Sequence, residues 1–259
     1  MKILIAGKGG VGKTTISALL SLELSERGYN VLALDTDSVP NLAMSLGIPS
    51  KEAEGIVPIS KDEKLIEEKT GANPGSGWGS LFSLTPKVDD IIERRCVKIK
   101  ENLKLLVVGS IDQSKEGCLC PAIALAKALL RHILLKERDV IIVDSEAGAE
   151  VFGRGLAERF SAMVCVSEPT YKSIKISKKL LEMGKELKIA NRVLLINKVQ
   201  KENLESLNRF SLSPYLMIEF DRNVKKIDEE GKPLTEIPID SPIRKGISLL
   251  AEKLLEAGQ

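Results

Sequence analysis

Short apolar runs alternate along the chain with longer segments in which apolar residues recur every third or fourth position. The runs predict buried strands, and the recurrence predicts amphipathic helices. Strands are expected at Lys2–Ala6, Asn30–Leu34, Leu103–Val108, Val140–Val143, Ala162–Val166, Val193–Ile196 and near Met217. Helices are expected at Lys13–Arg27, Pro121 to about Lys136, Tyr171–Leu187 and Pro242–Ala257. This alternation predicts an α/β fold with a mostly parallel sheet and helices on both faces, in one domain over residues 1–259.

Composition narrows the classes of protein that fit. The 259 residues are 43% hydrophobic and 29% charged, which is typical of a globular chain. A net charge of +2 does not indicate a nucleic acid or an acidic membrane as partner, and 3% aromatic residues argue against base stacking on aromatic side chains. The one histidine, His132, excludes a multi-histidine site within one chain. Met1–Ala6 is too short for the apolar region of a signal peptide, so we expect a cytoplasmic protein.

One segment departs from the alternation of strands and helices. Thr70–Ser80 contains four glycines and a proline around Trp78, the single tryptophan. Such a composition predicts a surface loop, and a lid or a partner contact is the alternative.

A phosphate-binding pattern follows the first predicted strand. Gly7–Thr15 reads GKGGVGKTT and fits G-x-x-x-x-G-K-[ST], placed between a strand and a helix. Backbone N–H groups of such a loop curl around phosphates, and the helix N-terminus adds its dipole. We expect Lys13 to reach the β- and γ-phosphates and the hydroxyl of Thr14 to bind Mg²⁺. The nucleotide-binding residues are predicted to be Gly9, Gly10, Val11, Gly12, Lys13, Thr14 and Thr15.

Lys8 gives this loop the form KGGVGKTT. The loop thereby resembles the deviant Walker A loop of the MinD/ParA/nitrogenase-iron-protein class of P-loop ATPases, the SIMIBI class. The resemblance implies a slow, Mg²⁺-dependent ATPase that binds ATP and ADP and forms a homodimer. It also implies that Lys8 crosses the dimer interface and stabilises charge in the transition state at the partner's nucleotide. The alternative is an exposed lysine near the phosphates.

Asp35–Asn41 ends the second predicted strand and resembles the first switch of that family. The resemblance places Asp35 and Asn41 in the switch and gives Asp37 the role of orienting the attacking water. Ser38 stands where the family usually has a proline. Without the resemblance, an aspartate at a strand end can simply cap the next turn.

Three further positions follow later strands. Asp144 ends an apolar run, in the pattern that holds the Mg²⁺ shell, and Gly148 resembles the second-switch glycine, a backbone donor near the γ-phosphate. Asn197 and Lys198 end another strand and resemble the family's adenine contact, with Asn197 the better candidate. All of these lie at carboxyl ends of strands, where α/β sheets gather their ligands.

Cys118 and Cys120 lie directly before the helix that starts at Pro121. A disulfide between them would be strained, whereas two thiolates at a helix N-terminus favour metal binding. A tetrahedral site needs four ligands, and a two-fold dimer would supply them. The alternative is that the pair is incidental small apolar filler. Cys165 is expected in the core and Cys96 in an exposed or peripheral position, both without a role.

Several segments together resemble the CooC-type ATPases, the nickel-insertion accessory proteins of carbon monoxide dehydrogenase. They are the deviant loop Gly7–Thr15 together with Gly117–Pro121, Asp144–Glu150, Gly153–Gly155, Val166–Pro169 and Gly231–Leu234. The resemblance implies a metallochaperone ATPase whose C-x-C cysteines bind Ni²⁺ or Zn²⁺ between subunits, under control of the nucleotide state. Carbon monoxide dehydrogenase, acetyl-CoA synthase or another nickel enzyme would be the client.

Three other functions stay open. A ParA-type DNA-partitioning ATPase would bind DNA through the basic segment Tyr171–Lys201, which holds nine Lys and Arg against two Glu. We expect instead that this segment contains a helix with a solvated basic side, whose Ile174, Leu180 and Leu181 face inward. A MinD-type membrane-cycling ATPase would need a basic amphipathic C-terminus, whereas Leu249–Ala257 is balanced in charge. An iron–sulfur cluster carrier would also suit four thiolates at a dimer axis.

Overall fold

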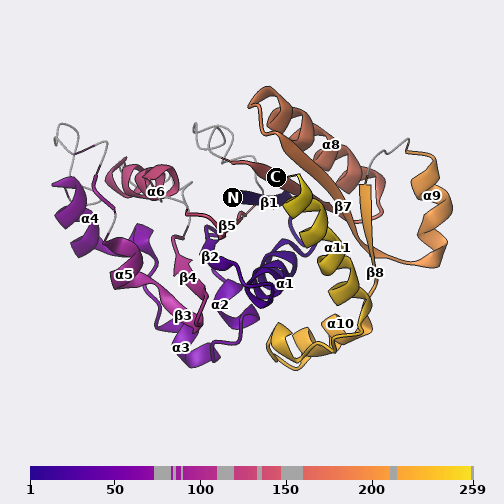
Figure 1. Cartoon of the computed structure of the whole chain (residues 1–259), viewed down its shortest axis with the longest axis horizontal. Helices are drawn as coiled ribbons and strands as arrows, with labels where there is room; N and C mark the ends of the chain where they lie inside the picture. The colour runs from indigo at the N-terminus through magenta and orange to yellow at the C-terminus, as the bar shows by residue number, and fades with distance from the viewer. Residues whose placement is uncertain are drawn as a thin grey trace.

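The strands form one eight-stranded sheet (Figure 1), with the order β3-β4-β2-β5-β1-β6-β7-β8. The structure is a computed structural model that describes residues 1–72, 83, 86–88, 90–109, 120–132, 136–146, 160–210 and 215–257. All neighbouring strands are parallel except β3 and β4. The bounds are β1 (Lys2–Gly7), β2 (Asn30–Asp35), β3 (Val97–Lys100), β4 (Leu103–Val107), β5 (Asp139–Asp144), β6 (Ala162–Ser167), β7 (Asn191–Val199) and β8 (Tyr215–Glu219). The predicted α/β fold class is confirmed.

Helices cover both faces of this sheet (Figure 1), and the sheet separates the apolar core into two clusters. Buried residues of α4, α6 and α8 belong to one cluster, and those of α1, α2 and α11 belong to the other. The α-helices are α1 (Lys13–Glu26), α2 (Leu42–Ser45), α3 (Ser50–Glu54), α4 (Glu63–Thr70), α5 (Ile91–Arg95), α6 (Cys120–His132), α8 (Tyr171–Glu186), α9 (Leu204–Asn208), α10 (Arg222–Glu229) and α11 (Pro242–Glu256). Short 3-10 turns lie at η1 (Ile59–Lys61), η3 (Lys201–Asn203) and η4 (Leu234–Glu236).

The long periodic segments lie where the sequence predicts them, with ends shifted by a few residues. On α8, Ile174 and Leu180 are buried and Leu181 is half-buried, as the inward-facing stripe predicts. Within the described part of the chain, no helix is both long enough and apolar enough to cross a bilayer.

The carboxyl ends of the central strands meet at one edge of the sheet. β1 lies between β5 and β6, and it ends at Gly7, where the phosphate loop begins. β2 and β5 pair in a register that sets Asp35 directly beside Asp144. The loop and the two aspartates therefore lie at one edge, because parallel strands all end on the same side of the sheet.

Gly7 is a position where the fold has no room for a side chain. Its φ is +148°, and an added Cβ would lie 2.2 Å from the carbonyl oxygen of Val166 on β6. We expect Gly7→Ala to lower the free energy of unfolding by about 2 kcal/mol or more, since backbone and strand must both shift. Urea unfolding without nucleotide measures this. Gly9→Ala is the matched control, because a Cβ there would meet nothing within 4 Å; equal losses in the two variants would contradict the expectation.

Candidate functional site

The phosphate loop runs from β1 into α1 through two glycines with left-handed backbone. Gly10 has φ +81° and Gly12 has φ +98°, values that side-chain-bearing residues rarely adopt. Gly12 is the N-cap of α1, and no side chain of the described residues caps this helix. As at the start of any α-helix, the first N–H groups of α1 have no acceptor within the helix, which is the arrangement that helix N-termini use to bind anions.

Lys13 folds back over this loop. Its side chain is 7% exposed, and Nζ lies 3.3 Å from the carbonyl oxygen of Lys8. Lys8 itself is exposed. The two lysines predicted to handle phosphate charge thus differ, since one is enclosed by its own chain and the other faces outward.

The two residues predicted to bind Mg²⁺ lie in contact. Thr14 Oγ1 donates to Asp144 Oδ2 at 2.7 Å, and Ser17 Oγ donates to Asp144 Oδ1 at 2.9 Å. Both partners come from the first turns of α1, while Asp144 ends β5 and is 1% exposed. Sequence reasoning did not identify Ser17, although its position one turn after Thr14 was the available signal.

Two buried carboxyl groups at this edge have raised pKa values. Burial raises the pKa of Asp144 to about 7, and the nearby Asp35 carboxylate adds to the rise. Burial also raises the pKa of Asp35 to about 6, against opposing hydrogen bonds from backbone N–H groups. Oxygen ligands in such a setting suit a hard cation, which would favour the ionised Asp144. The hydroxyl of Thr14 and the carboxylate of Asp144 therefore fit Mg²⁺.

The predicted first switch is folded by its own carboxylates. Asp35 accepts from the backbone N–H of Asp37 at 3.1 Å and of Leu42 at 3.0 Å. Asp37 accepts from the N–H of Val39 at 3.0 Å, and the side chain of Asn41 donates to the carbonyl of Val39 at 2.9 Å. Asp35 thus holds the two ends of the switch together. The role of Asp37 in orienting water stays a prediction. In this structure its carboxylate accepts a hydrogen bond within its own turn.

Asn197 and Lys198 reach the phosphate loop. Asn197 Nδ2 donates to the carbonyl of Val11 at 2.9 Å, and Lys198 Nζ donates to the carbonyl of Gly10 at 2.8 Å. Contact with Gly12 is also close, because a Cβ there would lie 2.6 Å from Asn197 Nδ2. Their predicted contact with adenine stays a prediction, and both also line the cavity beside the loop.

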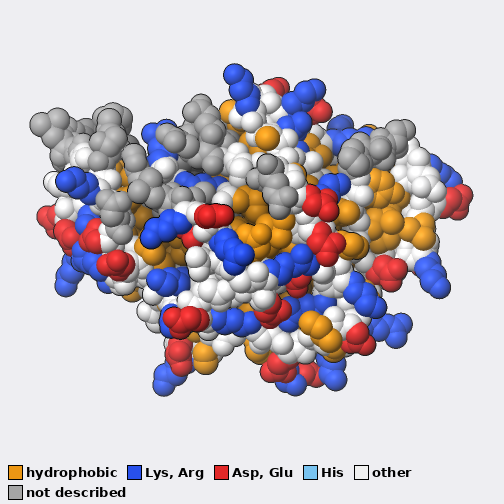
Figure 2. All heavy atoms as spheres, in the orientation of Figure 1, with side chains coloured by type: hydrophobic (Ala, Val, Ile, Leu, Met, Phe, Trp, Pro, Cys, Tyr) orange, Lys and Arg blue, Asp and Glu red, His pale blue; other side chains and the backbone are white. Residues whose placement is uncertain are grey.

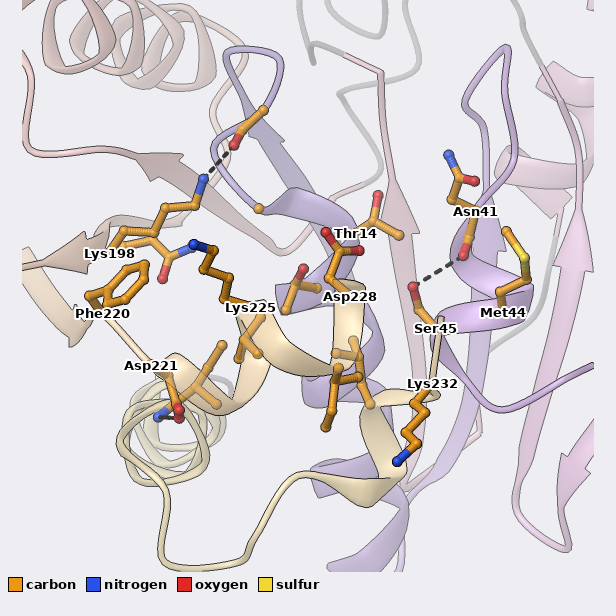
Figure 3. Close-up of a pocket in the computed structure, with 18 of the residues that line it drawn as sticks. Thr14, Asn41, Met44, Ser45, Lys198, Phe220, Asp221, Lys225, Asp228 and Lys232 are labelled. Carbon is orange, nitrogen blue, oxygen red and sulfur yellow. Dashed lines mark hydrogen bonds between the residues drawn. The ribbon is translucent and has the colours of Figure 1, made fainter. Parts of the chain in front are cut away.

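That cavity has a volume of about 700 Å³ and extends from the loop to α2 and α10 (Figure 3). Its wall opposite the loop comes from the end of β8 and from α10, which supply Phe220, Lys225 and Asp228. Asp221 holds this wall in place, since its carboxylate accepts from the N–H of Asn223 at 2.8 Å and of Ile243 at 3.2 Å. The sequence did not single out any of these residues, and the only signal was an aspartate shortly after a predicted strand.

Part of the predicted metal site lies outside the described residues. Cys118 lies there, as do Gly148 of the predicted second switch and Trp78 of the predicted surface loop, and of Cys120 only the backbone is described, as the first residue of α6. Cys165 is buried, as predicted, and burial raises its pKa above the usual range. Cys96 is half-buried, and burial raises its pKa to about 11. Among the residues that are described, no three His, Cys, Asp or Glu side chains gather as metal ligands.

Comparison with known proteins places this geometry among nucleotide-binding domains. The profile of the CobQ/CobB/MinD/ParA nucleotide binding domain matches residues 2–234. An uncharacterized ATP-binding protein of Methanocaldococcus jannaschii is 40% identical over 99% of this chain and 98% of its own. The carbon monoxide dehydrogenase accessory protein CooC of Rhodospirillum rubrum is 38% identical over 89% of this chain and 88% of its own. The MinD cell division protein of Aquifex aeolicus has a TM-score of 0.67 at 23% identity, covering 98% of this chain and 96% of its own, and it shows the fold alone.

Proposed function

Because the chain belongs to the CobQ/CobB/MinD/ParA family of nucleotide-binding domains, we propose that it is a dimerising Mg²⁺-dependent ATPase that handles a metal ion for a nickel enzyme. The observation that carries the ATPase part is the contact of Thr14 with Asp144 at the N-terminus of α1, directly after the phosphate loop. A nucleoside triphosphate needs such a combination of backbone donors and oxygen ligands for its phosphates and its cation.

The chain's own residues divide the work at the phosphates. Lys13 neutralises charge on the β- and γ-phosphates once it leaves the carbonyl of Lys8. Thr14 and Asp144 hold the cation, which supplies charge neutralisation when bound. Asp37 turns from its own loop to orient the attacking water. Phe220 and Asp228 offer an aromatic and a carboxylate wall for the base and the sugar.

Lys8 is assigned to the partner's site. It is exposed at the edge where the loop opens, so a second copy facing this edge can receive its ammonium group. Two triphosphates that lie close together at a dimer interface repel each other. This repulsion falls when each subunit inserts one positive charge into its partner's site. Binding of ATP thereby favours the homodimer.

The metal part of the proposal rests on the cysteines and on one relative. Cys118 and Cys120 provide two thiolates per chain, and a two-fold dimer provides the four that a closed tetrahedral site needs. The relative named CooC is 38% identical along most of both chains. Ni²⁺ or Zn²⁺ is the proposed cargo, and carbon monoxide dehydrogenase or a related nickel enzyme is the proposed client.

Removal of both thiols tests the metal part. We expect the reduced wild-type protein to bind one Ni²⁺ or Zn²⁺ per dimer, and the Cys118→Ser, Cys120→Ser variant to bind none. Titration without oxygen, with the mass of the complex followed throughout, measures both stoichiometry and assembly. Cys96→Ser is the control, since its thiol is half-buried and has a raised pKa. Equal metal content in wild type and double variant would refute the thiolate site while leaving the ATPase intact.

One observation favours a second candidate, a DNA-partitioning ATPase. Helix α8 carries exposed lysines, among them Lys172, Lys175 and Lys179, and basic side chains are prominent at the top of Figure 2, where Figure 1 places α8. Over the rest of the face in view, basic and acidic side chains are interspersed (Figure 2). Affinity for duplex DNA that falls steeply with salt, combined with no thiolate metal, would favour this candidate.

A further inference from the structure

Lys198 has a backbone conformation that its residue type disfavours. Its φ is +59°, in the left-handed region, and it lies where the pairing of β7 with β8 shifts register between Ile196 and Val199. A side-chain-bearing residue is kept in this region only when its surroundings fix it, and such residues gather at functional sites. The left-handed backbone at this bulge therefore indicates a role for the Lys198 side chain.

The ammonium group of Lys198 has two fixed acceptors. Nζ lies 2.7 Å from Glu168 Oε1 and 2.8 Å from the carbonyl oxygen of Gly10, the second shown as a dashed line in Figure 3. Glu168 follows β6, and its own N–H donates to Ser173 Oγ at 3.0 Å, at the start of α8. One carboxylate on a fixed segment therefore holds the lysine against the phosphate loop.

Asn197 makes the neighbouring contact, on the next carbonyl of the loop. The carbonyls of Gly10 and Val11 are consecutive, and they point at the side chains of Lys198 and Asn197 respectively. In a planar trans peptide the N–H points opposite to the C=O. The N–H groups of Val11 and Gly12 must therefore point away from these two side chains, and they belong to the loop whose N–H groups would cradle phosphates.

We propose that Lys198 is a positioning residue that, together with Asn197 and under the hold of Glu168, fixes the direction of two peptide groups in the phosphate loop. The inference rests on the proposed nucleotide binding and assigns the Lys198 side chain to the loop in place of the base. The charge of Lys198 is balanced by Glu168, so its effect is exerted through the loop's shape. Donors that are aimed in advance lose no free energy to reorganisation when the polyphosphate arrives.

Calorimetric titration with Mg²⁺–pyrophosphate, Mg²⁺–ADP and AMP separates the two roles. We expect Lys198→Met to weaken pyrophosphate and ADP by about tenfold or more, the loss typical of one charged hydrogen bond. The affinity for AMP and the preference for ATP over GTP should stay within about twofold, because the base site is unchanged. Lys201→Met is the matched control: it removes the same charge from an exposed position three residues further on.

Glu168→Gln provides the opposite test of charge. The substitution makes the site more positive, so a lysine acting as a direct phosphate contact would bind pyrophosphate more tightly. A lysine that positions the loop would instead lose the carboxylate that fixes its ammonium group. We therefore expect the affinity for pyrophosphate to fall by about threefold or more. If Lys198→Met fails to fold, Lys198→Gly removes the ammonium while suiting the positive φ.

Two results would overturn the inference. Lys198→Met could leave pyrophosphate affinity intact while weakening AMP or erasing the preference for ATP, which would make Lys198 a base contact. Tighter pyrophosphate binding by Glu168→Gln would make it a phosphate contact. A wild-type protein that binds neither ATP nor pyrophosphate would instead refute the proposed function itself, so the two failures are distinguishable.

Discussion

Replacing Asp144 by asparagine is expected to stabilise the nucleotide-free protein and to abolish the extra stability that Mg²⁺ adds to its nucleotide complex. Asp144 is 1% exposed, and its carboxylate accepts hydrogen bonds from Thr14 and Ser17. An asparagine keeps both contacts, since a hydroxyl can donate to its oxygen or accept from its nitrogen. It removes the buried charge, but it also removes a ligand of the proposed cation.

The sign of the pH dependence follows from the raised pKa values. Burial raises the pKa of Asp144 to about 7 and that of Asp35 to about 6, whereas both lie near 4 in the unfolded chain. The folded protein thus keeps protons that the unfolded chain releases, and stability falls as pH rises through 6 and 7. At pH 8 we expect Asp144→Asn to gain on the order of 4 kcal/mol at most, because the pKa rises by about three units and each unit corresponds to about 1.4 kcal/mol.

Thermal unfolding between pH 5 and pH 8, with and without Mg²⁺–ADP, measures both effects. Wild type should lose stability with rising pH when metal is absent, and Asp144→Asn should show a shallower slope. Asp240→Asn removes an exposed carboxylate and should behave as wild type. A less stable Asp144→Asn at pH 8, or an unchanged response to Mg²⁺, would contradict this account.

Lys8→Ala is expected to lower the rate of ATP hydrolysis by about 10³-fold or more, the range found for charged groups inserted from a partner. Affinity for ATP should change little, because Lys8 is exposed and the enclosed lysine of the loop is Lys13. Steady-state rates and equilibrium titration with a non-hydrolysable analogue measure the two quantities. Lys51→Ala, at another exposed lysine, is the control.

Mixing two inactive variants tests whether Lys8 acts across the dimer. Lys8→Ala keeps its own Asp37, and Asp37→Asn keeps the lysine that it lends to its partner. A mixed dimer therefore contains one complete site, and activity should return when the two proteins are combined. No recovery in dimers of confirmed mixed composition would place the action of Lys8 within its own subunit.

The site residues at the sheet edge were predictable because short stretches of neighbouring residues specify each of them. Glycines between an apolar run and a helix specify the loop, and Asp35 and Asp144 each end an apolar run. Parallel strands then bring the two aspartates into register. Helix α10 was not predictable, since Val224 and Ile227 are its only apolar residues and its place depends on the cap that Asp221 provides.

Side-chain direction was the other quantity hidden from the sequence. Asn197 and Lys198 were identified as a pair after a strand, but the bulge at Lys198 decides that the pair meets carbonyls of the loop. Ser17 was missed for a related reason. Its hydroxyl matters only because α1 packs against the end of β5, and its place one turn after Thr14 was the one signal in the sequence.

The central place of β1 has a consequence for synthesis. The N-terminal ammonium donates to the carbonyl of Asp139, 138 positions along the chain, and both strands that flank β1 come from that half. At about 5–20 residues per second, a ribosome needs roughly 7–30 s to make the intervening segment. During that interval β1 has no neighbouring strand, so the apolar Ile3, Leu4 and Ile5 lack their partners in the sheet and are available to chaperones on the nascent chain.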